Sequence, residues 1–143
     1  MKDEPAVIIR LEGNGRSYRP GESLSGEYVF QELSADQIKA LEVSVLWYTE
    51  GKGEEDMTVH KFWRTDLEIG DVFEPQRPAR FETILPNSPL SYNGQIIKVH
   101  WCVRVRAFLH RGKEVFGQKE FRLGDVPPIK CLPQKSPLPS PEG

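Results

Sequence analysis

The residues best suited to bind a charged ligand lie in one stretch, residues 96–111, which reads IIKVHWCVRVRAFLHR. At the side-chain period of a β-strand, its basic side chains share one side of the strand, namely Lys98, His100, Arg104 and Arg106. Arginine presents a planar fork of N–H donors that matches carboxylates and phosphates. This basic row is therefore a candidate binding surface for an acidic or phosphorylated peptide. The alternative is that the row pairs with acidic residues on neighbouring strands, such as Glu42 or Glu120.

The same stretch raises the question of a metal site, because His100 and Cys102 share a side of the strand and His60 belongs to a predicted neighbouring strand. No Cys-x-x-Cys or His-x-x-x-His spacing supplies further ligands, so we predict no metal and no cofactor. Nucleophilic catalysis needs a Ser, Cys or Thr beside a base, and the sequence has three histidines and no G-x-S-x-G turn. We assign no catalytic residues, and the chain is not predicted to be an enzyme.

Composition narrows the classes of partner. The 143 residues are 38% hydrophobic, which suits one globular domain. The 19 basic and 21 acidic residues nearly cancel, so no overall field attracts nucleic acid, and none is predicted as a partner. No run of residues approaches the length of about 18 apolar residues that a membrane span needs, so no membrane insertion is predicted. The two cysteines, Cys102 and Cys131, form no disulfide framework, which favours a cytoplasmic location.

The basic row has to be positioned by a sheet, because the opposite side of its strand is apolar and must be buried. Ile97, Val99, Trp101, Val103 and Val105 alternate with the basic residues, and we expect them to be buried. Turn residues separate this strand from other segments of similar pattern. The predicted strands are residues 6–12, 23–31, 38–49, 57–64, 79–85, 96–111 and 114–123. This spacing, without a helical segment of useful length, predicts a single all-β domain: an antiparallel, immunoglobulin-like β-sandwich over residues 1–124.

The composition changes after residue 124. Six prolines occur in the last nineteen residues, and proline cannot donate a sheet hydrogen bond. Residues 125–143 are therefore predicted to be an extended, proline-rich tail or linker.

Several turn motifs occur in an order that resembles a known family. Pro20-Gly21-Glu22 leads into a strand that contains Gly26, a long hairpin follows, and Leu85-Pro86 and Ser91-Tyr92-Asn93-Gly94 precede the long strand. Over residues 6–124 this order resembles the N-terminal domain of arrestins and arrestin-domain proteins.

The resemblance implies an arrestin-like sandwich that acts as a non-catalytic scaffold or adaptor for a protein or peptide partner. It also implies a role for the hairpin loop, because this loop corresponds in position to a partner-contacting loop of the family. The loop residues Gly51, Lys52, Gly53, Glu54, Glu55 and Asp56 therefore join Lys98, His100, Arg104 and Arg106 as partner-binding candidates.

A different class of function is also compatible with a β-sandwich. The chain could be an extracellular immunoglobulin-like or carbohydrate-binding module whose signal peptide is missing. That reading requires exposed aromatic side chains in a row on one sheet face, because sugars stack on such rings. The candidates for this row are Phe62, Trp63 and Tyr92.

Overall fold

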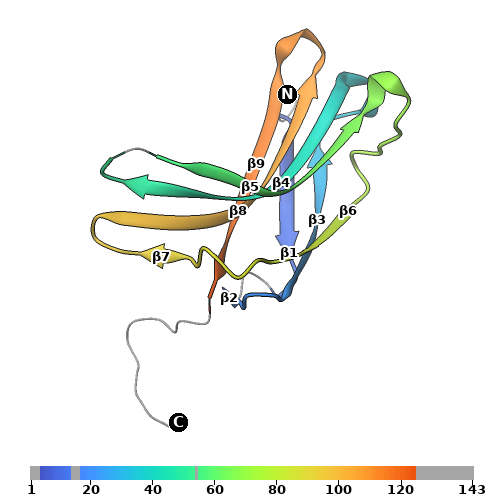
Figure 1. Ribbon diagram of the computed structural model, residues 1–143. Helices are drawn as coiled ribbons and strands as arrows, with labels where there is room; N and C mark the ends of the chain where they lie inside the picture. Colours follow the sequence, from blue (N-terminus) through green and yellow to red (C-terminus); the bar gives the residue numbers. More distant parts are fainter. Residues whose placement is uncertain (1–3, 14–16, 54, 125–143) are drawn as a thin grey trace.

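The computed structural model describes residues 4–13, 17–53 and 55–124, and most of these lie in β-strands (Figure 1). The helices of the described part are three short 3-10 turns, none of which has the length and apolar character needed to cross a membrane. The elements are β1 (Ala6–Leu11), β2 (Ser17–Tyr18), β3 (Ser23–Gln31), η1 (Ala35–Gln37), β4 (Ile38–Gly51), β5 (Met57–Asp66), η2 (Leu67–Ile69), β6 (Ala79–Ile84), β7 (Tyr92–Asn93), β8 (Ile97–Leu109), η3 (His110–Gly112) and β9 (Glu114–Leu123).

Two sheets pack around one hydrophobic core. The smaller sheet has the strand order β1-β3-β6, and the larger has the order β2-β9-β8-β4-β5, with β7 also paired to β8. All pairings are antiparallel except the short parallel pairing of β2 with β9. The core draws side chains from both sheets, which confirms the predicted all-β sandwich. The predicted tail, residues 125–143, lies outside the described residues.

Strand alternation places the core face of the larger sheet. Val43 and Val45 of β4 lie opposite Val105 and Val103 of β8, and all four side chains are buried. Trp101 is also fully buried, as the sequence pattern predicts. A strand with apolar residues at every second position buries one face and leaves the other free for polar groups. The basic row is therefore presented on the face of the larger sheet that points away from the smaller sheet.

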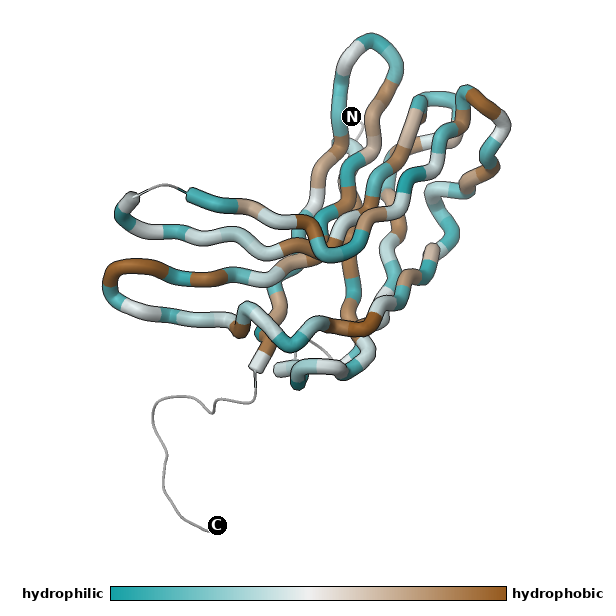
Figure 2. The backbone as a smooth tube through the Cα atoms, viewed as in Figure 1, coloured by the Kyte–Doolittle hydropathy of each residue, from teal (hydrophilic) through white to brown (hydrophobic). Residues whose placement is uncertain are grey.

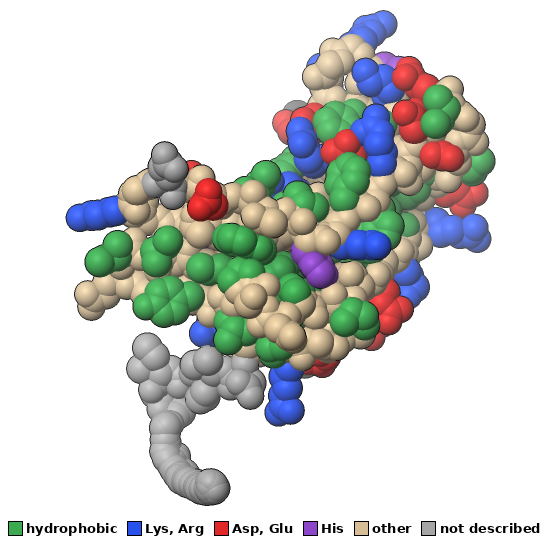
Figure 3. Space-filling view, in the orientation of Figure 1, with side chains coloured by type: hydrophobic (Ala, Val, Ile, Leu, Met, Phe, Trp, Pro, Cys, Tyr) green, Lys and Arg blue, Asp and Glu red, His purple; other side chains and the backbone are tan. Residues whose placement is uncertain are grey.

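The prediction that Ile97 is buried was wrong. Its side chain is 38% exposed, and Val99 beside it is only half-buried. The physical reason is the length of the larger sheet: β4, β5 and β8 extend past the strands of the smaller sheet and form a projecting arm (Figure 1). Hydrophobic residues continue to the tip of the β7–β8 hairpin (Figure 2), and hydrophobic side chains gather over this arm in the space-filling view (Figure 3).

Candidate interaction surface

The predicted basic row lies on what we call the outer face, the face of the larger sheet that points away from β1-β3-β6. Strand β8 contributes Lys98, His100, Arg104 and Arg106 to it. Because β8 is central, the ladder brings a residue of β4 to one side of each of these, and β9 or β7 lies along the other side of the strand. The neighbours on β4 are Glu42, Ser44, Tyr48 and Glu50. On the other side, Arg104 and Arg106 lie opposite Gln118 and Phe116 of β9, and Lys98 lies opposite Asn93 of β7.

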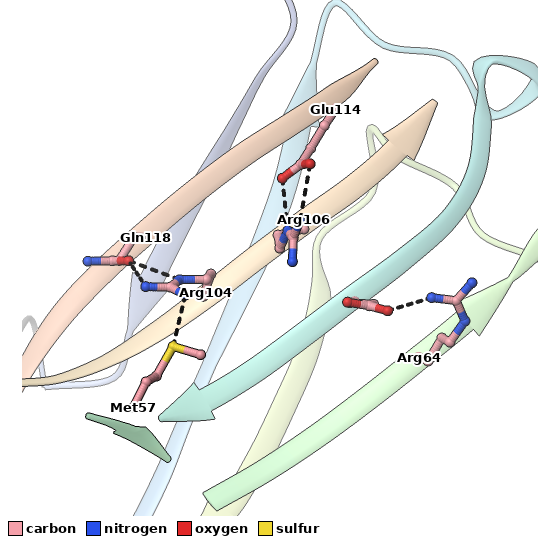
Figure 4. A network of polar contacts seen from close by, with 7 residues as sticks. Met57, Arg64, Arg104, Arg106, Glu114 and Gln118 are labelled. Carbon is pink, nitrogen blue, oxygen red and sulfur yellow. Dashed lines mark hydrogen bonds and ion pairs between the residues drawn. The ribbon is translucent and has the colours of Figure 1, made fainter. Parts of the chain in front are cut away.

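Arg106 has a carboxylate partner. Its Nε donates to one oxygen of Glu114 at 2.8 Å, and its Nη2 donates to the other at 3.2 Å (Figure 4). This paired hydrogen bond raises the pKa of Arg106 and lowers the pKa of Glu114. Glu42, which the sequence suggested as a partner for the row, instead accepts a hydrogen bond from Arg64 of β5. The charge of Arg106 is therefore already compensated within the sheet.

His100 lies between two carboxylates. Its Nε2 is 2.7 Å from Glu50 and its Nδ1 is 2.6 Å from Glu120, while the ring of Tyr48 stacks on it with centroids 5.0 Å apart. The structure thus confirms that Glu120 pairs with the row. Lys98, nearer the tip of the arm, makes no ion pair within the described residues, and it lines an open hollow between β7 and β9 together with Asn93, Arg122 and others.

Arg104 differs from its neighbours because it contacts only uncharged groups. Its Nε and Nη2 donate to the side-chain oxygen of Gln118 at 3.1 and 2.9 Å, and its Nη1 lies 3.5 Å from the sulfur of Met57 (Figure 4). The guanidinium also lies over the ring of Phe116, 5.5 Å from its centroid. No carboxylate of the described chain forms an ion pair with it. Arg104 is therefore a positioned cation that lacks an ion-pair partner in the part of the chain that the structure describes.

The floor of the outer face beside Arg104 is apolar. Leu46 and Cys102 face each other across β4 and β8, and both are fully buried although they belong to this outer side. Burial raises the pKa of the Cys102 thiol to about 11, more than the nearby Arg104 charge lowers it. A thiol that keeps its proton is a poor nucleophile and a poor metal ligand. Cys102 acts here as a small hydrophobic side chain.

Large hydrophobic side chains on the same face as Arg104 remain exposed. Met57 and Phe62 of β5 are 56% and 49% exposed, and Phe116 of β9 is 52% exposed. Sequence reasoning did not single out Met57 or Phe116, and it named Phe62 only as a candidate for sugar stacking, because it followed the charges of β8. Strand alternation could have identified Phe116. It follows the buried Val115 in β9, and adjacent residues of a strand point to opposite faces, so its ring is expected to point outward.

The candidate loop of residues 51–56 lies at the tip of the arm, apart from the arginines of the row. Lys52 donates its backbone N–H to the carbonyl of Ile96 at 3.2 Å, so the tips of the two hairpins are joined. At the loop's end, the backbone N–H of Asp56 donates to the Thr49 hydroxyl at 2.8 Å. Gly51, Lys52, Gly53, Glu55 and Asp56 are exposed, whereas Glu54 lies outside the described residues.

The histidines and cysteine considered for a metal site do not come together. His60 contacts the carbonyl of Ile84 at 2.8 Å and the edge of Trp101, so it lies on the opposite side of the sheet from His100 and Cys102. Among residues 4–13, 17–53 and 55–124, no three His, Cys, Asp or Glu side chains are placed to hold a metal ion.

The aromatic side chains that a carbohydrate site would need are also separated. Trp63 packs against Phe81 of the smaller sheet with centroids 6.0 Å apart, so its ring is turned inward. Phe62, its neighbour in β5, lies on the outer face, and Tyr92 belongs to β7 in the arm. These rings form no row on one sheet face within the described part of the chain.

Comparison with known proteins locates the fold without giving a family. No protein-family model matches the sequence, and no curated protein sequence matches it significantly. Among solved structures, the chain is similar to Spo0M, a sporulation control protein from Bacillus subtilis, with a TM-score of 0.61 and 16% sequence identity over 87% of this chain and 51% of that one. The chain thus spans about half the length of Spo0M.

A second similarity is weaker: the superoxide reductase neelaredoxin from Ignicoccus hospitalis, with a TM-score of 0.46 and 11% identity over 82% of this chain and 80% of that one. This likeness is too low to support an argument. The likeness to Spo0M shows that the two chains share a β-sandwich fold.

Proposed function

We propose that this chain is a non-catalytic regulatory domain with an arrestin-like fold, and that it binds a protein or peptide partner through the outer face. The fold shared with Spo0M, a protein named for sporulation control, is the observation that carries the proposal. The turn motifs support the arrestin-like assignment, since Pro20-Gly21-Glu22 forms the turn before β3, and Leu85-Pro86 follows β6.

The outer face is the proposed binding surface because it combines apolar area with a free charge. Exposed hydrophobic side chains that cluster beside polar groups are typical of interaction sites. Met57, Phe62 and Phe116 supply the apolar area, and Arg104 supplies the charge. The loop of residues 51–56 and Lys98 extend this surface along the arm, where a larger partner would reach them.

Two further parts of the proposal concern chemistry and location. The domain performs no reaction of its own, which agrees with the buried, protonated thiol of Cys102 on this face. It acts in the cytoplasm, since a sequence with two cysteines and no disulfide framework suits a reducing compartment. The favoured partner is an acidic or phosphorylated protein or peptide, and no nucleic acid is involved.

The test compares capture of partners from a cell lysate by three forms of the full chain. The wild type is compared with a double variant, Phe62→Ser with Phe116→Ser, and with a control, Ile84→Ser. Ile84 is 60% exposed on the smaller sheet, so its replacement removes a similar apolar side chain from a different surface.

We expect quantitative mass spectrometry to find a partner that the wild type and Ile84→Ser capture equally and that the double variant loses. All three forms should melt at similar temperatures, because exposed side chains contribute little to stability. Equal capture by the double variant, or no reproducible partner for the wild type, would contradict the proposal.

A further inference from the structure

Among the outer-face arginines of β5 and β8, Arg104 is the one that makes no ion pair within the described residues. Arg106 pairs with Glu114, Arg64 pairs with Glu42, and His100 lies between Glu50 and Glu120. The described partners of Arg104 are Gln118, Met57 and Phe116, all of them uncharged. We propose that Arg104 is the anchor for a carboxylate that a partner peptide presents between two apolar side chains. This inference rests on the proposed function and names the chemistry of the partner at the same surface.

Arg104 is held in place before any partner arrives. Gln118 accepts two hydrogen bonds from its guanidinium, at 3.1 and 2.9 Å, and the ring of Phe116 lies beneath its planar group. An exposed arginine normally loses much side-chain freedom when it binds, and this loss weakens binding. Gln118 and Phe116 have already restricted Arg104, so a partner meets a preorganised donor.

Counting donors shows what Arg104 can still bind. A guanidinium carries five N–H groups, one on Nε and two on each terminal nitrogen. Gln118 takes the Nε donor and one Nη2 donor, and Met57 takes one Nη1 donor. One N–H therefore remains on each terminal nitrogen, which is the number that the two oxygens of a carboxylate accept.

The flanking side chains define the rest of the partner. Met57 comes from β5 and Phe116 from β9, which lie on opposite sides of β8 in the sheet order, so apolar surface borders the guanidinium on both sides. In an extended peptide, side chains two residues apart share a face and are separated by about 7 Å. An acidic residue with apolar residues two positions before and after it therefore presents one carboxylate to Arg104 and one apolar group to each border.

The surrounding charges favour a carboxylate over a phosphate. Glu114 and Glu120 lie on the neighbouring strand and already contact Arg106 and His100. A phosphate carries about two negative charges and gains most from several cations, whereas a carboxylate carries one charge and matches a single arginine. Ser44, opposite Arg104 in the ladder, is buried and uncharged, so β4 adds no second cation at this position.

The experiment uses three blocked pentapeptides and the full chain labelled for NMR. The probe is Leu-Thr-Glu-Thr-Leu, acetylated and amidated, and the comparison peptides carry glutamine or phosphoserine in the central position. Each is titrated into the wild type, Arg104→Gln, Arg104→Lys and the matched control Arg106→Gln. Both glutamine variants should keep their melting temperature within about 3 °C, because exposed polar contacts contribute little to stability.

We expect the wild type to bind the glutamate peptide about tenfold more tightly than the glutamine peptide, since a charge-assisted pair is worth roughly this factor. Arg106→Gln should keep this preference, Arg104→Gln should lose it, and Arg104→Lys should keep only part of it, because lysine lacks the fork. Shifts should centre on Phe116, Gln118 and Met57. A preference that persists in Arg104→Gln overturns the inference, as does tighter binding of the phosphoserine peptide or no saturable binding up to about 5 mM.

Failure of this inference is distinguishable from failure of the proposed function. If the Phe62→Ser and Phe116→Ser double variant loses its lysate partner while Arg104→Gln keeps it, the outer face binds that partner without the arginine anchor. If all of these variants capture the same partner equally, the outer face itself is not the binding surface.

Discussion

Trp101 is the largest fully buried side chain of the described chain, and both its ring and its N–H group have partners. Its indole Nε1 donates to the carbonyl of Pro89 at 2.8 Å, and its ring packs against Phe121 and the edge of His60. A buried tryptophan stabilises a core through its apolar area, provided that its N–H has a partner. Trp101 meets both conditions because the segment before β7 passes directly over it.

Replacing Trp101 with alanine should therefore destabilise the protein by about 3–5 kcal/mol, since it removes packing and leaves a cavity. Denaturant unfolding followed by circular dichroism measures this loss. Ile97→Ala, in the same strand but in the uncovered arm, is the matched control and should cost less than about 1 kcal/mol. A loss below about 1 kcal/mol for Trp101→Ala would show that this tryptophan is not part of the core.

Cys102 predicts a specific dependence of stability on pH. Burial raises the pKa of its thiol from an ordinary value of 9.0 to about 11. Between these values the unfolded chain releases the thiol proton while the folded chain keeps it, so the unfolded state gains stability as the pH rises. The free energy of unfolding should fall by about 1 kcal/mol between pH 8 and pH 10.

The measurement is a series of denaturant titrations across this range for the wild type and Cys102→Ala. The alanine variant should show a flatter pH dependence, whatever its absolute stability. Measurements stop at pH 10 because Tyr28, whose pKa burial raises to about 12, adds a similar effect above its ordinary value of 10.0. Equal slopes for both proteins would contradict the assignment of a buried, protonated thiol.

At the scale of elements, β3 depends on a close approach between backbones. A Cβ atom placed on Gly26 would lie 2.4 Å from the carbonyl oxygen of Arg10 in β1 and 2.9 Å from the ring of Phe81 in β6. Glycine inside a strand often marks either a bulge or such a close approach, and the structure shows the close approach here.

Gly26→Ala should therefore cost about 1–3 kcal/mol, because the added methyl group forces β1 or Phe81 to move. Thermal unfolding of the variant, with Ser25→Ala in the same strand as the control, measures the effect. The serine replacement should stay within about 0.5 kcal/mol of the wild type. Similar stability for both variants would mean that the sheet adjusts without strain.

Sequence alternation predicted the long strands well, and each of the seven predicted segments is a strand with ends within two residues of those expected. The two-residue strands β2 and β7 were missed. Their pairing depends on where the chain lies in three dimensions: Tyr18 becomes a strand residue because it lies beside Leu123. Local patterns contain no information about such contacts.

The partners within the candidate site were less predictable than the strands. Arg106 lies directly opposite Glu42 in the ladder, yet it binds Glu114, a diagonal neighbour on β9. Both acids are within reach of a long side chain, and Arg64 of β5 takes Glu42. The choice depends on strand order and on a register shift between Val45 and Leu46 in the pairing with β5, which the sequence does not specify.

At the scale of the whole molecule, the end of β9 is tied by hydrogen bonds to two distant segments of the chain. Leu123 is fully buried, and its carbonyl accepts a hydrogen bond from the backbone of Ser91 at 2.8 Å. Gly124 then donates to the carbonyl of Tyr18 at 2.7 Å. These bonds join the last strand to β2 and to the segment that leads into β7.

Removal of residues after 132, or of all residues after 124, should change the melting temperature by less than about 3 °C, because the prolines of these segments cannot donate sheet hydrogen bonds. A third form that ends at residue 119 is the control. It lacks Phe121 and Leu123, which are buried beside Trp101 and Tyr18, and it should fail to unfold cooperatively. Calorimetry of the three forms distinguishes the cases, and a drop of more than about 5 °C in the form ending at 124 would show that residues 125–143 contribute to the stability of the sandwich.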